Sequence, residues 1–183
     1  MTEEQEFDKV ALFIGRYLLI FQYIEDKIDQ MLLLGADLER RHVGNSFLAA
    51  MGYRQKVDAL SGIVHTSKIA QGDETQKEWI KAFGRLVNQW QAEGARRNGI
   101  VHSLHVFDFV KIGAPVFRNR MRPHPKGFRI KNANVDEKEA DNVVAEIAQL
   151  LWDTGLAHVQ LVHWYEDLGQ PGDRVRPARS LSS

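Results

Sequence analysis

The sequence has no cysteine and no excess of either charge, and both absences narrow the classes of protein to which it can belong. None of the 183 residues is cysteine, so a disulfide framework, a thiolate nucleophile and a cysteine-ligated zinc site are all excluded. Lys and Arg together number 24, as do Asp and Glu, and the formal net charge is zero. A strongly basic nucleic-acid coat and an acidic solvating tail are therefore excluded as well.

The sequence also lacks a long uninterrupted apolar run. Its most apolar stretch, residues 10–21, contains Arg16 and is shorter than the roughly 20 residues that span a bilayer. The first residues are acidic where a signal peptide would be basic. We therefore expect a cytoplasmic protein without a membrane partner. A composition of 44% hydrophobic and 26% charged residues is typical of a globular chain, and the length fits one domain.

Apolar residues recur at helical spacing in four long segments. Gly35 supplies a stop signal for the first, Gly52 a break within the second, and Asp73 an N-cap for the third. The predicted helical segments are residues 1–35, 46–68, 73–104 and 134–168, with a charged connector at 37–44. Four such segments in order predict an all-α fold, an up-and-down four-helix bundle.

Before the last helix the sequence changes to short β-prone stretches separated by Gly and Pro. They predict a small β insertion at about 105–132 within a single domain of residues 1–168, followed by a disordered tail at 169–183. Arg118, Arg120 and Arg122 alternate, so on a strand they would share one face. That face is either a solvated strand surface or a surface that contacts phosphates.

One segment, residues 94–103, combines residue types that suit phosphodiester chemistry. It contains Arg96, Arg97, Asn98 and His102 beside the apolar stripe of the third helix. Asn98 and His102 are four residues apart and would be neighbours on a helix, where the amide could orient the imidazole. Histidine transfers protons near neutral pH, and the arginine fork fits a phosphate and its developing charge. RNA brings its own nucleophile, the 2′-hydroxyl, so this chemistry requires no metal.

The hexapeptide RNGIVH, from Arg97 to His102, resembles the motif of the HEPN superfamily, in which an arginine and a polar residue precede a histidine by a fixed spacing. The resemblance in helical layout covers roughly residues 7–168, although the β insertion departs from the minimal HEPN bundle. It implies a bundle of four or five helices and a metal-independent RNA endonuclease, often a toxin or antiphage defence protein, in which two motifs meet at a homodimer interface. By this resemblance Arg97 and His102 would be catalytic and Asn98 the polar helper.

The same resemblance predicts RNA or a nucleotide as ligand and allows an antitoxin protein as a further partner. We place Arg96 among the substrate-binding residues, together with Arg118, Arg120 and Arg122 of the predicted insertion. We expect no cofactor and no metal, because the single Glu-x-x-His pattern, residues 39–42, has no second copy.

Three alternatives remain open from the residues alone. Asn98-Gly99 is a turn dipeptide, and a strand could begin directly after it, which would make His102 an ordinary strand histidine. The domain could instead be a non-catalytic HEPN-like module that binds a nucleotide or a protein. It could also be a purely structural bundle, in which Arg97 and His102 lie apart or in satisfied contacts.

Overall fold

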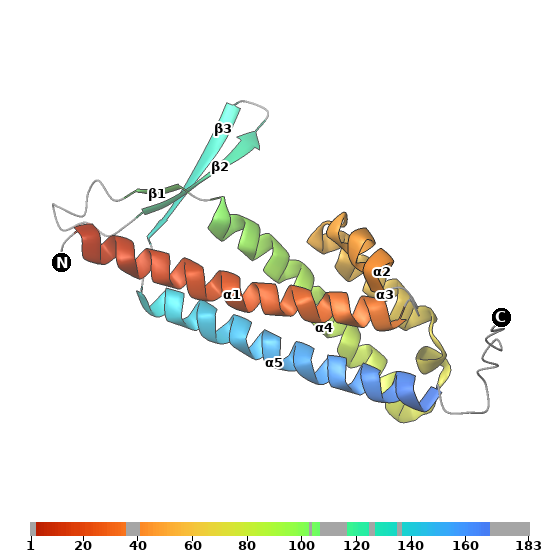
Figure 1. The fold of residues 1–183 in the computed structure, drawn as a ribbon. Helices are drawn as coiled ribbons and strands as arrows, with labels where there is room; N and C mark the ends of the chain where they lie inside the picture. Colours follow the sequence, from red (N-terminus) through yellow and green to blue (C-terminus); the bar gives the residue numbers. More distant parts are fainter. Residues whose placement is uncertain are drawn as a thin grey trace, which may run out of the picture.

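The described part of the chain is mainly α-helical (Figure 1). The computed structural model describes residues 3–35, 41–102, 104–106, 117–124, 127–134 and 137–168. Its helices are α1 (Glu3–Gly35), α2 (Arg41–Ala49), α3 (Tyr53–Thr66), the 3-10 helix η1 (Lys68–Gln71), α4 (Glu74–Val101) and α5 (Glu137–Leu168). The predicted all-α class is confirmed. The tail predicted at 169–183 lies outside the described residues.

Two helix starts follow from local hydrogen bonds that the sequence encodes. The Asp73 carboxylate accepts the backbone N–H of Gln76 at 2.9 Å, and the Gln76 side chain accepts the Asp73 N–H at 3.2 Å, which is a capping box at the start of α4. Gly52 separates α2 from α3 as predicted, and its N–H donates to Gln55 Oε1 at 2.8 Å. Helix α2 begins at Arg41, so the predicted connector at 37–44 is helical in its second half.

The predicted up-and-down order of the helices is wrong. Helices α1 and α3 run in the same direction, because Phe21 contacts Tyr53 and Gly35 lies against Ile63. Figure 1 shows α5 running beside α1 in that direction as well, while α4 runs opposite to both α3 and α5. Helix α2 stands between α1 and α3 in the chain, and α3 begins beside the middle of α1 and runs parallel to it.

The core lies where α1, α3, α4 and α5 meet. Its largest fully buried side chains include Trp90, Tyr17 and Phe83. The Trp90 indole donates to Thr154 Oγ1 at 2.9 Å, and Thr154 Oγ1 donates to the Leu150 carbonyl at 2.6 Å. This chain of hydrogen bonds satisfies the polar groups that join α4 to α5 inside the core.

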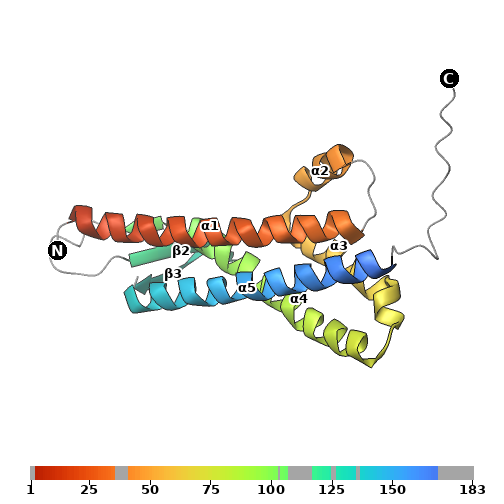
Figure 2. The ribbon, with the colours of Figure 1, turned by 60° about the horizontal axis from the view of Figure 1, so that its bottom comes forward.

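Three strands lie between α4 and α5 at one end of the helical body (Figures 1 and 2). They are β1 (Leu104–Val106), β2 (Phe117–His124) and β3 (Gly127–Asn134), and they form an antiparallel sheet in the order β1-β2-β3. In the register of β2 and β3, Arg120 is opposite Lys131 and Arg122 is opposite Arg129.

Candidate functional site

The RNGIVH segment forms the C-terminal end of α4. The helix continues through Asn98 and Gly99 to Val101, and His102 is its C-cap, with its N–H donating to the Asn98 carbonyl at 3.1 Å. The alternative in which Asn98-Gly99 turns into a strand is therefore wrong. The physical reason is tertiary: Gly99 and Ile100 are buried against the core, and this packing outweighs the turn preference of the dipeptide.

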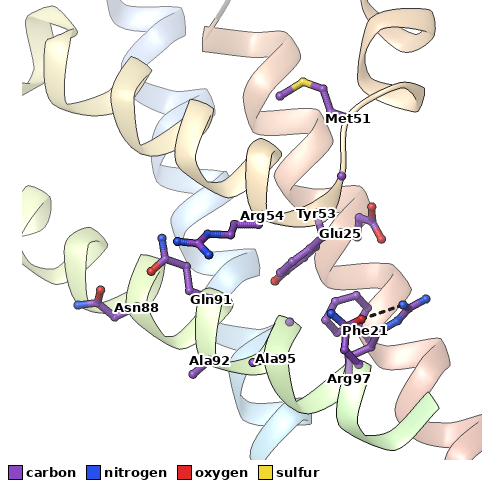
Figure 3. Close-up of a pocket in the computed structure, with 13 residues that line it drawn as sticks. Phe21, Glu25, Met51, Tyr53, Arg54, Asn88, Gln91, Ala92, Ala95 and Arg97 are labelled. Atoms are coloured by element: carbon purple, nitrogen blue, oxygen red, sulfur yellow. Dashed lines mark hydrogen bonds between the residues drawn. The ribbon is translucent and has the colours of Figure 1, made fainter. Parts of the chain in front are cut away.

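Arg97 and Asn98 line a cleft of about 880 Å³ between α1, α3 and α4 (Figure 3). Phe21 and Glu25 of α1 form one side, and Tyr53 with its neighbours at the start of α3 forms the other. The α4 side of the cleft extends from Asn88 to Asn98. The full lining is Phe21, Glu25, Met51, Gly52, Tyr53, Arg54, Asn88, Gln91, Ala92, Gly94, Ala95, Arg97 and Asn98.

The Arg97 guanidinium is held in place but is not neutralised. Its Cζ lies 5.8 Å from the centre of the Phe21 ring, and its Nη1 donates to Asn98 Oδ1 at 3.2 Å. Its Nε is buried without a hydrogen-bond partner, and no carboxylate among the described residues forms an ion pair with it. An arginine that is stacked on a ring and lacks an acidic partner is prepared for an anion such as phosphate.

His102 is exposed and is not among the residues that line this cleft. It follows Asn98 by one helical turn, so it lies beyond the end of the cleft that carries Arg97. The predicted contact of the Asn98 amide with His102 is not seen. Its oxygen instead accepts a hydrogen bond from Arg97. The structure therefore brings Arg97 and Asn98 together and leaves His102 at the surface beside them.

Arg96, predicted to bind substrate, belongs to a structural network on the other side of α4. Its Nη1 lies 2.7 Å from a Glu146 oxygen of α5 and 3.5 Å from a Glu93 oxygen. Glu93 is buried, and the Tyr17 hydroxyl donates to its other oxygen. These contacts satisfy the buried carboxylate and engage Arg96 with two acids, so they connect α1, α4 and α5.

The wall of the cleft contains residues that the sequence motif did not indicate. A Cβ atom on Gly94 would lie 2.8 Å from Cδ1 of Tyr53, so glycine is required for this close approach. The Tyr53 hydroxyl is buried without a hydrogen-bond partner. Burial and the nearby charges of Glu25 and Glu93 raise the pKa of Tyr53 above its usual range, so the phenol is protonated and can donate a hydrogen bond.

The acidic residue of the cleft, Glu25, is neutralised by a buried lysine. Lys56 Nζ lies 3.0 Å from a Glu25 oxygen and 2.8 Å from an Asp29 oxygen. Burial of Lys56 disfavours its charge, but its hydrogen bonds to Asp29 and Glu25 outweigh burial, and the pKa of Lys56 is raised. Glu25 therefore repels an anion in the cleft less than a free carboxylate would.

Arg118, Arg120 and Arg122 lie on β2, and none of the described residues that line the cleft belongs to this strand. In the backbone register Arg118 is opposite Ala133 of β3, and the side chains of the three arginines lie outside the described part of the structure. Two further findings concern metal binding and membrane spans in the described part of the chain. No group of three or more His, Asp or Glu among them is arranged to hold a metal ion, and no helix among them has the length and apolarity of a membrane span.

Comparison with known proteins does not assign this chain to a family: no family model, no curated protein and no solved structure matches it.

Proposed function

We propose that this protein is a metal-independent RNA endonuclease of HEPN type, built on a four-helix bundle with a β insertion. The observation that carries the proposal is the state of Arg97. It is half-buried in a cleft, stacked near Phe21 and without an acidic partner among the described residues. It is also the first residue of the RNGIVH motif.

In the proposed reaction the RNA 2′-hydroxyl attacks the adjacent phosphorus, and the bond from phosphorus to the 5′-oxygen breaks. Arg97 stabilises the charge that develops on the phosphate oxygens. His102 transfers protons, either from the attacking 2′-hydroxyl or to the leaving 5′-oxygen. The products are a 2′,3′-cyclic phosphate and a 5′-hydroxyl. Asn98, which accepts a hydrogen bond from Arg97, acts as a positioning residue for the guanidinium.

A single His102 cannot act as base and acid in one step, so the proposal includes a homodimer in which two motifs face one cleavage site. Apolar side chains exposed on α1 and α5 offer a face for self-association, but Tyr23 is about 200° around α1 from the cleft residue Phe21, so this face lies on the side of α1 away from the cleft. These side chains include Trp152 and Val159, each 65% exposed, and Tyr23, 62% exposed. We expect Trp152→Glu to shift the protein from dimer to monomer in sedimentation equilibrium. A dimer that persists with this variant and with Tyr23→Glu would exclude this face.

A second candidate is a non-catalytic module that binds RNA or a nucleotide in the same cleft. The observation that favours it is the position of His102, which is exposed and outside the cleft lining. The toxin or antiphage role and the antitoxin partner stay predictions that follow from the resemblance, and the cytoplasmic location stays a prediction from the sequence.

The test is cleavage of a single-stranded RNA by the purified protein in EDTA. We expect Arg97→Gln to lower kcat by about 100- to 1,000-fold, because it removes a donor that acts on developing charge. His102→Ala is expected to lower kcat by about 100- to 10,000-fold.

Two matched variants control for unrelated effects on the fold. Arg85→Gln changes an exposed arginine of α4 outside the cleft, and His65→Ala changes an exposed histidine of α3. Both are expected to retain full activity. RNA binding without cleavage would support the binding module, and cleavage unaffected by His102→Ala would contradict the assigned roles.

A further inference from the structure

The cleft is a groove that continues along α4 well beyond the motif. Arg97 and Asn98 lie at one end and Asn88 at the other, and the exposed alanines Ala92 and Ala95 form the floor between them (Figure 3). The ten residue steps from Asn88 to Asn98 correspond to about 15 Å along a helix. Small side chains between polar ends leave room for a ligand to lie along the helix.

The size of the groove indicates a ligand larger than a phosphate group. Its volume of about 880 Å³ lies within the roughly 300–1,000 Å³ that is typical of pockets for small molecules and cofactors. A phosphate on Arg97 would occupy only one end. The remainder, above Ala92 and Ala95, can hold the sugar and base that are attached to that phosphate.

The polar groups of the groove suit the edge of a nucleobase. Asn88, Gln91 and Asn98 carry amides, each of which can donate and accept hydrogen bonds, and amides of this kind pair with base edges. The Gln91 nitrogen already donates to Asp58 Oδ1 at 2.8 Å, so its oxygen is left as an acceptor. The Asn98 oxygen accepts from Arg97, which leaves its NH₂ as a donor.

The walls of the groove suit the flat face of a base. The ring that the groove offers is Tyr53, which is partly exposed and belongs to the lining. The Phe21 ring, with its centroid 4.7 Å from that of Tyr53, is buried and supports Tyr53 from behind. Stacking on aromatic rings is a general way of binding unpaired bases. A duplex offers no separate base for such a groove, so the arrangement selects single-stranded nucleic acid.

We propose that the groove over Ala92 and Ala95 is a subsite for one unpaired nucleotide, adjoining the phosphate that Arg97 holds, with the amides of Gln91 and Asn98 contacting the base. This inference rests on the proposed function for the position of the phosphate, and it adds the substrate class and the residues that contact the base.

The test is a substitution that fills the groove at a residue outside the RNGIVH motif. Ala95→Leu enlarges an exposed floor residue, and Ala82→Leu makes the same change at an exposed position of α4 outside the lining. Binding is measured by fluorescence anisotropy with labelled 2′-O-methyl RNA octamers of U, A or C, which lack a free 2′-hydroxyl and cannot be cleaved by the proposed reaction. The duplex of the U and A octamers is the control ligand.

We expect wild type and Ala82→Leu to bind at least one single strand more tightly than the duplex. For that strand, the affinities of the two proteins are expected to agree within about twofold. Ala95→Leu is expected to weaken that binding by about tenfold or more, which is the contribution of one stacked base. Cleavage of the unmodified octamer is measured in parallel, and Ala95→Leu is expected to raise KM.

The outcomes separate this inference from the proposed function. Cleavage that depends on His102, with affinity and KM unchanged in Ala95→Leu, overturns the subsite and keeps the nuclease. Single-strand binding that Ala95→Leu weakens, without cleavage by wild type, keeps the subsite and overturns the nuclease. Equal affinity for the duplex, or no binding of any octamer by wild type, overturns the subsite.

Discussion

Two glycines of α4 provide a direct test of the cleft geometry, because the same substitution is expected to act in opposite directions at the two positions. At Gly84 a Cβ atom would meet nothing within 4 Å. Gly84→Ala is therefore expected to stabilise the protein by about 0.5–1 kcal/mol, since alanine costs less backbone entropy in a helix. For a chain of this size the melting temperature rises by about 1–4 °C.

At Gly94 the added Cβ would lie 2.8 and 2.9 Å from Cδ1 and Cε1 of Tyr53. The Tyr53 ring is rigid and packs on Phe21, so it must move as a unit. Overpacking of this kind costs about 1–3 kcal/mol, which exceeds the helical gain of about 0.5–1 kcal/mol. We expect Gly94→Ala to destabilise the protein by about 1 kcal/mol, the difference between these two contributions.

The assay is urea unfolding of both variants, followed by far-UV circular dichroism. The curves are fitted with one common m value, the slope of the unfolding free energy against urea concentration. A Gly94→Ala variant as stable as Gly84→Ala would refute the packing of Tyr53 on α4. The cleft wall described above would then be wrong.

Three further perturbations test the interior. Thr154→Val leaves the Trp90 indole N–H without its acceptor and is expected to lower the free energy of unfolding by about 1–3 kcal/mol, measured by urea unfolding. Lys56→Ala leaves the partly exposed carboxylates of Glu25 and Asp29 without their shared cation. We expect it to lower the free energy of unfolding by up to about 3 kcal/mol, the low end for a broken buried pair. A loss at pH 7 below about 0.5 kcal/mol would show that this pair behaves as an exposed one. Burial, with a smaller contribution from the Lys27 charge, lowers the pKa of His158, against the opposing charge of Asp26. The unfolded state therefore binds the proton more readily, and stability should fall as the pH drops below about 6.5. If His158 makes this contribution, the difference in unfolding free energy between pH 7.5 and pH 5 is smaller in His158→Gln than in the wild-type protein.

The helices and their ends could be predicted because their signals are local. The Asp73 N-cap and the Gly52 break depend on residues within one turn of the boundary, and both predictions are confirmed. The direction of α3 could not be predicted in this way. It depends on which part of α1 the start of α3 contacts, and the apolar periodicity within α3 carries no information about that contact.

The candidate site was predictable in part for the same reason. Arg97 and Asn98 were found from a short motif, and both line the cleft. Tyr53 and Gly94 carry no local signal, since their contact joins residues far apart in the chain. The engagement of Arg96 was equally hidden, because its partner Glu146 lies on α5 and only the packed structure brings the two charges together. A basic residue beside a motif can therefore be structural, and the sequence does not distinguish the two roles.

The most direct test of the central claim is the chemical identity of the RNA ends after incubation in EDTA. Mass spectrometry of the products of a defined single-stranded RNA distinguishes the possible reactions. We expect 2′,3′-cyclic phosphate and 5′-hydroxyl ends with wild type and His65→Ala, and intact RNA with His102→Ala. Ends that carry a 5′-phosphate and form only with added Mg²⁺, or cleavage that persists in His102→Ala, would contradict the central claim.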